Sequence, residues 1–238
     1  MKQHFLIIDT ETTQDGLVAD FAAVICDRKG NILAQCAVLV NGVFTDSENH
    51  PLYFTSDDEG IWSKKGQDRR YKIYKRMVDN GSRMIASVPA INAWLCKAVA
   101  AYNPTLTAYN LAFDTEKCAN TGIDLTIFKS NFCLWQAAFT LFAHLRTFRQ
   151  MVLETHSFNP PTKFGNMTFK TNAEVMARFV TGNHTLEDEP HTALEDIIFY
   201  ELPILKAVFS KKSFRWLMAN IKPYSWKDTQ VKDWFKAK

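Results

Sequence analysis

Residues 4–11 read His-Phe-Leu-Ile-Ile-Asp-Thr-Glu, and this stretch decides the fold. Four consecutive apolar residues end at the acid Asp9, a pattern typical of a central buried strand. Because side chains along a strand alternate between its two faces, Asp9 and Glu11 project from the same side. Two like charges at the end of a buried strand cost free energy unless a cation neutralises them. The stretch therefore predicts a cation site, with an exposed strand end as the alternative.

The acid-x-acid pattern alone is not specific. It also occurs in polar segments at Asp46/Glu48, Asp57/Glu59 and Glu187/Glu189. These three pairs lie in polar, loop-like sequence, where a solvated surface explains them. Only the first pair follows an apolar strand, and we single it out for that reason.

Two further apolar segments, 18–26 and 31–40, are separated by the turn sequence Asp27-Arg-Lys-Gly-Asn31, which predicts an antiparallel hairpin. Helical and strand patterns alternate after residue 87. The expected elements are helices from Pro89, from about 112, and over 136–150, 172–180 and 191–209, the last bent near Pro203, with strands at 105–109 and 129–135. This order predicts an α/β fold with helices on both faces of a mixed five-stranded sheet, in which three antiparallel N-terminal strands precede parallel ones.

At 238 residues the chain is long enough for one large domain or two small ones. Residues 41–66 lose all periodicity and are interpreted as loop. We expect one domain over 1–210, with a basic insertion at about 43–85. Residues 211–238 are basic and aromatic, and we expect them to form a helical extension packed on the same domain.

The composition is that of an ordinary water-soluble protein. No apolar run approaches the ~18 residues of a membrane span, and the N-terminus does not resemble a signal peptide. The net charge of +3 permits a polyanionic partner. Five scattered cysteines predict reduced thiols in a cytoplasmic compartment and argue against a zinc site: Cys26, Cys36, Cys96, Cys118 and Cys133.

A second acidic motif lies between the strand at 105–109 and the helix that follows it. Here Asn110-Leu-Ala-Phe-Asp114 places Asp114 in the first helical turn. In an α/β sheet, ligands bind at the carboxyl ends of strands, so Asp114 is expected near Asp9 if the two strands are neighbours. The alternative is that Asp114 only complements the helix dipole.

The third motif is His191-Thr-Ala-Leu-Glu-Asp196. A His followed five residues later by an acid also occurs at His4/Asp9 and His184/Glu189, so the context decides. Pro190 is expected to start a helix with His191 in its first turn and an apolar face behind it. Asp196 then points toward the sheet, and the rival acid Glu195 is expected to face solvent.

Taken together, the motifs resemble the DnaQ-like, DEDDh family of 3′→5′ exonucleases, which has the ribonuclease H-like fold. The resemblance is carried by Asp-Thr-Glu-Thr (9–12), Ala-Tyr-Asn-Leu-Ala-Phe-Asp (108–114) and His-Thr-Ala-Leu-Glu-Asp (191–196), with 20–24 similar to the family's second strand. It spans roughly residues 4–205. The family often has Gly soon after the first motif, where this chain has Thr13-Gln14.

The resemblance implies a role for each residue. Asp9 would bridge two Mg²⁺ or Mn²⁺ ions, Glu11 and Asp196 would hold the more tightly bound ion, and Asp114 would position the second. His191 would act as general base on the attacking water. The residues implied in substrate binding are Thr10, Thr12, Asn110 and Phe113.

The resemblance implies an exonuclease that releases nucleoside 5′-monophosphates from the 3′ ends of DNA, preferably single-stranded. A 3′→5′ exoribonuclease similar to oligoribonuclease and a catalytically silent nucleic-acid-binding module are the alternatives. The basic stretch 64–83 interleaves eight Lys or Arg residues with Tyr71 and Tyr74, as single-strand binding surfaces do. A solvated helix packing Ile73 and Met77 on the body is the alternative. The sequence leaves the oligomeric state open.

Overall fold

The computed structural model describes residues 3–161, 163, 165–216, 219 and 229–231. Within them six strands form one sheet: β1 (His4–Thr12), β2 (Val18–Asp27), β3 (Ile32–Val40), β4 (Met84–Ala86), β5 (Thr105–Ala108) and β6 (Asn131–Cys133). Their order is β4-β3-β2-β1-β5-β6. The first three strands are antiparallel neighbours, whereas β4, β5 and β6 pair in parallel. The expected mixed α/β fold is confirmed, with the short β4 as a sixth strand.

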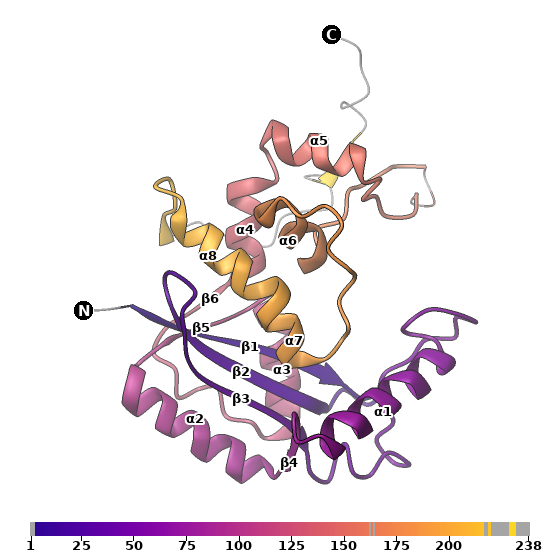
Figure 1. Ribbon diagram of the computed structural model, residues 1–238, viewed down its shortest axis with the longest axis vertical. Helices are drawn as coiled ribbons and strands as arrows, with labels where there is room; N and C mark the ends of the chain where they lie inside the picture. Colours follow the sequence, from indigo (N-terminus) through magenta and orange to yellow (C-terminus); the bar gives the residue numbers. More distant parts are fainter. Residues whose placement is uncertain (1–2, 162, 164, 217–218, 220–228, 232–238) are drawn as a thin grey trace.

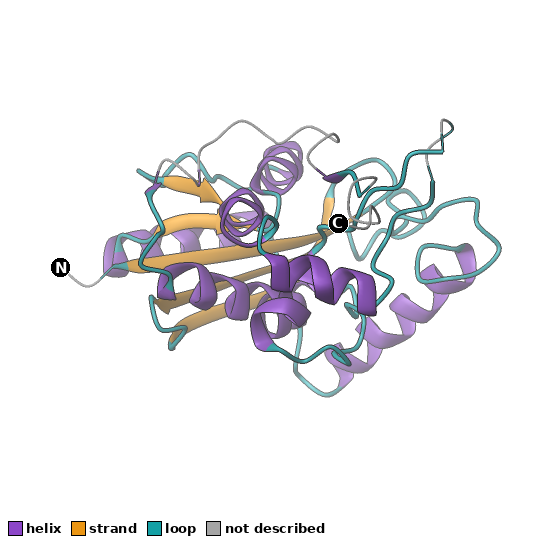
Figure 2. Ribbon diagram, turned by 90° about the horizontal axis from the view of Figure 1, so that it is seen from above, coloured by secondary structure: helices purple, strands orange, loops and turns teal. Residues whose placement is uncertain are grey.

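Helices cover both faces of this sheet (Figure 1). Figure 2 shows the same layers from above, with the strands between two sets of helices. The helices are α1 (Lys64–Asp79), α2 (Val88–Tyr102), α3 (Leu111–Thr121), α4 (Leu134–Phe142), α5 (Arg146–Glu154), α6 (Ala173–Thr181), α7 (Ala193–Asp196), the π-helix η1 (Ile197–Glu201) and α8 (Leu202–Ser210). No helix in the described part of the chain is long and apolar enough to cross a membrane.

Alternation along β1 divides its apolar side chains between two cores. Phe5 and Ile7 pack with α4, α6 and α8, whereas Leu6 and Ile8 pack with α2 and α3. Asp9 continues the row of Phe5 and Ile7. The strand therefore directs this carboxylate toward the face that carries η1 and α8.

The insertion is folded onto the domain rather than separate from it. The Ser63 hydroxyl caps α1 by accepting a hydrogen bond of 3.0 Å from the backbone N–H of Gly66. A Cβ at Gly66 would lie 2.2 Å from the Ile61 carbonyl oxygen, so only glycine fits there. Tyr74 on α1 is fully buried in the core of α2 and α3. The start of α1 is therefore fixed against the loop that precedes it.

Two expected helices differ from those observed. The helix expected over 136–150 is two helices, α4 and α5, separated at 143–145. The helix expected over 191–209 begins only at Ala193, and its irregularity is the π-helix η1 rather than a bend at Pro203. Pro203 lies in the first turn of α8, where its missing N–H needs no partner.

The C-terminal extension is described only in part, and Lys222 and Trp226 lie outside the described residues. Its first residues pack on the domain, because the rings of Phe214 and Trp216 lie 4.9 and 5.6 Å from that of Phe209. The helical character expected for 211–238 and the division at residue 210 stay predictions.

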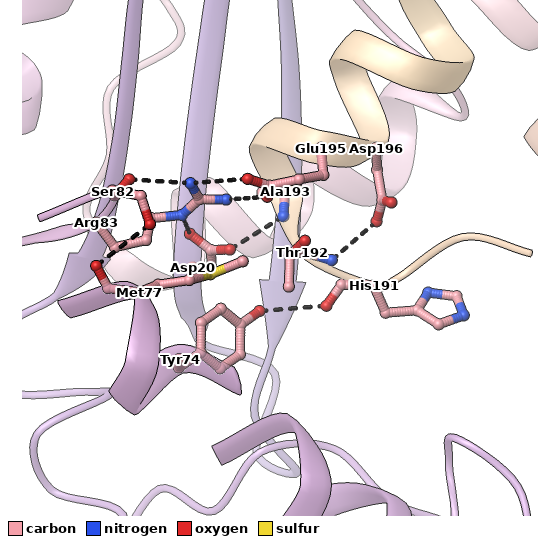
Figure 3. A network of polar contacts seen from close by, with 10 residues as sticks. All are labelled: Asp20, Tyr74, Met77, Ser82, Arg83, His191, Thr192, Ala193, Glu195 and Asp196. Atoms are coloured by element: carbon pink, nitrogen blue, oxygen red, sulfur yellow. Dashed lines mark hydrogen bonds and ion pairs between the residues drawn. The ribbon is translucent and has the colours of Figure 1, made fainter. Parts of the chain in front are cut away.

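A buried ion pair connects the sheet to the segment that carries the third motif (Figure 3). Nε of Arg83 donates to Asp20 Oδ1 on β2 at 3.3 Å, and its Nη2 donates to Glu195 on α7. The other oxygen of Asp20 accepts the backbone N–H of Ala193 at 3.0 Å. Burial raises the pKa of Asp20 to about 6, although Arg83 opposes that shift. The expectation that Glu195 faces solvent is wrong, because this carboxylate pairs with a buried guanidinium.

We predict that Arg83→Met lowers the free energy of unfolding by about 3 kcal/mol, because it leaves the buried carboxylate of Asp20 without its partner. Urea denaturation followed by circular dichroism measures this change. Arg69→Met, at an exposed position of α1, is the matched control and should change stability by less than about 0.5 kcal/mol. Equal effects of the two substitutions would contradict the structural role of Arg83.

Candidate metal centre

A cleft of about 850 Å³ opens where β1 and β5 end. The two strands are parallel neighbours, so their carboxyl ends lie at the same edge of the sheet. All the residues selected from the sequence line this cleft: Asp9, Thr10, Glu11, Thr12, Asn110, Phe113, Asp114, His191 and Asp196. Residues separated by more than 180 positions in the chain thus meet in one place.

Three of these residues could hold one metal ion. Glu11, His191 and Asp196 each offer a ligand atom within 4.8 Å of the other two. Asp196 Oδ2 accepts the Thr192 N–H at 3.1 Å, whereas its Oδ1 is buried without a hydrogen-bond partner. A buried carboxylate oxygen without a partner is costly, and a divalent cation would satisfy it. The donor set therefore fits a hard divalent cation.

Asp114 approaches the same place from the other side of β1. It lies in the first turn of α3, which begins after Asn110 in a left-handed conformation with φ of +79°. The Thr10 hydroxyl donates a hydrogen bond of 2.9 Å to Asp114 Oδ1. Because Thr10 lies between Asp9 and Glu11 and points to the opposite face, it fixes Asp114 beside the strand. This hydroxyl, expected near a terminal nucleotide, is engaged with a carboxylate.

Burial and mutual repulsion favour the neutral, protonated forms of these carboxyl groups. The pKa of Asp9 is raised well above its ordinary value by burial and then by neighbouring carboxylates, among them Glu201 and Asp114. Burial likewise raises the pKa of Asp114 to about 7 and that of Asp196 to about 10, the latter with help from Glu11. The cleft concentrates more negative charge than its surroundings can compensate.

His191 lies outside α7, with a φ of +54°, so the expectation that Pro190 starts the helix with His191 in its first turn is wrong. Its carbonyl oxygen accepts the Tyr74 hydroxyl at 3.3 Å, and its ring points away from the Arg83 network (Figure 3). Nδ1 lies 3.7 Å from Glu11 Oε1. Burial lowers the pKa of His191, but Glu11 and other nearby carboxylates more than offset this and raise it.

Of the two interpretations of the basic stretch 64–83, phosphate tracking is wrong for Arg70. Its side chain is fully buried, with Nη1 3.8 Å from Glu11 Oε2, and its guanidinium lies 4.7 Å from the ring centroid of Trp62. The Trp62 ring in turn lies 4.4 Å from that of His191. Arg70 therefore supports the wall of the cleft instead of its outer surface. Nothing in the basic pattern of 64–83 distinguishes it from its exposed neighbours.

Two acids of the cleft were missed in the sequence. Glu189, interpreted as solvated surface, lines the cleft and forms a second cluster with Glu174 and His191. Burial and then Glu174 raise the pKa of Glu189 to about 7. Glu201 on η1 is almost fully buried and also lines the cleft. The spacing of the three motifs points to neither residue.

Comparison with known proteins finds only distant similarity, and only among solved structures. No family model and no curated protein matches the chain. Among solved structures, exonuclease I in complex with the inhibitor BCBP is similar with a TM-score of 0.47 and 13% sequence identity. The match covers 92% of this chain and 43% of that one, so the chain spans less than half the length of exonuclease I.

We predict that the protein stripped of cations with a chelator becomes less stable as the pH rises through the neutral range. The pKa of Asp114, about 7, and that of Asp196, about 10, lie above the ordinary value of 3.8, so the folded state binds more protons than the unfolded state between these values. Melting temperatures measured over this range in EDTA should fall, and Mg²⁺ should reduce the slope. A flat profile in EDTA would show that the pKa values of these carboxyl groups are not raised in the folded state.

Proposed function

We propose that this protein is a metal-dependent 3′→5′ exonuclease of the DnaQ-like, DEDDh family that acts on DNA, preferably single-stranded, and releases nucleoside 5′-monophosphates. The observation that carries the proposal is the convergence of Asp9, Glu11, Asp114, His191 and Asp196 in one cleft. Their order along the chain and their residue types are those of the family motifs. An exoribonuclease and a catalytically silent binding module are the alternatives, and digestion of matched DNA and RNA strands distinguishes them.

In this proposal the carboxylates would hold two Mg²⁺ or Mn²⁺ ions, which would supply positive charge to stabilise the attacking and leaving oxygens of the phosphodiester. Asp9, Glu11, Asp114 and Asp196 are the ligands, since hard carboxylate oxygens suit these cations. His191 takes a proton from the attacking water. The side chain of His191 is partly exposed at the cleft surface, which leaves the imidazole accessible to that water.

The cleft wall supports a single-stranded substrate. Tyr53, Trp62 and Phe113 line the cleft, and Phe113 exposes 42% of its surface. Exposed aromatic rings stack on unpaired bases without strong sequence preference. Lys117 and Lys170 also line the cleft and supply positive charge for the backbone. Thr12, Asn110 and Phe113 are the residues we assign to the terminal nucleotide.

We also propose a cytoplasmic location. All five cysteines are free thiols, as a reducing compartment requires.

We predict that Glu11→Gln lowers the rate of release of the 3′ nucleotide from a labelled single-stranded DNA by about a thousandfold or more, because it removes a charged ligand. Release is followed in Mg²⁺ and in EDTA. Glu48→Gln, in an exposed acid-x-acid pair outside the cleft, should retain wild-type activity.

Three outcomes separate the alternatives. Faster digestion of a matched RNA strand than of DNA would identify RNA as the preferred substrate. Binding of both strands without digestion in any divalent cation would favour the silent module. Equal activity of wild type and Glu11→Gln would remove the candidate centre from the chemistry.

We predict that the exposed basic side chains of α1 contribute to substrate binding. Lys72 and Arg76 are exposed on this helix, next to a shallow groove. Affinity for a polyanion falls as the salt concentration rises. The double substitution Lys72→Ala/Arg76→Ala should make the slope of log affinity against log salt less steep, by about 0.7 for each phosphate that the helix no longer neutralises. Fluorescence anisotropy with labelled single-stranded DNA in Ca²⁺ measures it. An unchanged slope, equal to that of the control Lys97→Ala/Lys129→Ala, would place this surface outside the binding site.

A further inference from the structure

Glu201 is a further carboxylate in the cleft, and it belongs to none of the three motifs. Only 3% of its surface is exposed, although it lines the cleft. Its Oε1 accepts the backbone N–H of Tyr109, which follows β5, at 3.2 Å. Its Oε2 is buried and has no hydrogen-bond partner. One oxygen is therefore fixed by the protein, and the other is available to a ligand.

The π-helix explains why this acid faces the site. In a regular α-helix, Glu201 would be rotated by about 140° from Asp196, five residues earlier, and would point to another face. A π-helix hydrogen-bonds residue i to i+5, which places such residues one turn apart on the same side. The N–H of Leu202 bonds to the carbonyl of Ile197 in this way. The extra residue of η1 thus aligns Glu201 with Asp196.

The surroundings of Glu201 contain other acids, among them Asp114 and Glu189. Within the part of the chain that the structure describes, no ion pair involves Glu201. Burial and then Asp114 raise its pKa well above the ordinary value. After burial, Glu201 is the largest contributor to the raised pKa of Asp9. A buried acid facing other acids has no evident role in stabilising the fold.

We propose that Glu201 is an additional metal-ligating residue of this cleft, which holds a divalent cation through Oε2. The inference rests on the proposed function, since it concerns the same cations. A cation at this place satisfies the free oxygen and offsets the repulsion between Glu201 and its neighbouring carboxylates. The competing role is structural: Glu201 would only anchor the backbone of Tyr109, and no cation would touch it.

Glu201→Gln separates the two roles, because an amide oxygen still accepts the Tyr109 N–H while the charge is lost. Mn²⁺ binding to the protein without substrate is measured by electron paramagnetic resonance and calorimetry. The metal-ligand role predicts that one Mn²⁺ binds at least about tenfold more weakly. Glu116→Gln, which removes an exposed charge on α3, should leave Mn²⁺ affinity unchanged.

Thermal stability gives a second readout. In EDTA, at a pH high enough to ionise the cluster, Glu201→Gln should raise the melting temperature by removing a repelling charge, and the further rise on adding Mn²⁺ should be smaller than in wild type. If the variant binds Mn²⁺ like wild type, the inference is overturned. Where the amide variant does not fold, Glu201→Asp replaces it. Its shorter side chain keeps the charge but withdraws the oxygen, so the same loss of Mn²⁺ affinity is expected, and unchanged affinity overturns the inference.

Asp9→Asn distinguishes this failure from that of the proposed function. If wild type binds no Mn²⁺, both the proposed function and the role of Glu201 fail. If Asp9→Asn loses Mn²⁺ and Glu201→Gln does not, only the inference on Glu201 fails.

Discussion

Repulsion among buried carboxylates at the end of β1 is the constraint on which the rest of the site depends. Asp9 is surrounded by four other acids within electrostatic reach, and burial raises its pKa further. Such a cluster persists in a folded protein only if protons or cations neutralise it. Within the described residues, the basic side chains that pair with Glu11 are Arg70, at 3.8 Å, and His191, at 3.7 Å. The cluster therefore contains more carboxylates than basic side chains that could neutralise them.

Holding these acids together requires rigid support, and the sheet provides it. β1 is hydrogen-bonded on both sides, so the position of Asp9 cannot shift without breaking the ladder to β2 or β5. Asp20, on β2, accepts the N–H of Ala193 and thereby ties the last motif to the sheet. Arg83, the residue before β4, forms ion pairs with both Asp20 and Glu195 and so connects β2 to α7. A site built on strands and their direct partners is held more precisely than one built on loops alone.

Local sequence patterns predict the parts of this structure that depend on neighbouring residues in the chain, such as strand alternation and turns. Period-two alternation placed Asp9 and Glu11 on one face, and the turn at 27–31 gave the hairpin of β2 and β3. Long-range contacts were not predictable in this way. Arg70 looks like its exposed neighbours until Tyr53 and Trp62 are folded over it. The π-helix likewise leaves no periodic signal, because a single extra residue in a turn changes which side chains align without changing composition. Glu201 could therefore be recognised only in the structure.

The cleft has two halves of different origin. Its floor consists of acids at the ends of sheet strands and on the segment packed against them. One wall consists of Tyr53 and Trp62, which come from the segment between β3 and α1. This wall also reaches the floor, because Trp62 lies between Arg70 and His191. Changes in the segment between β3 and α1 can therefore reshape this wall while the carboxylates stay fixed. They also act on the environment of His191, so the shape of the wall and the surroundings of this imidazole are physically coupled through one tryptophan.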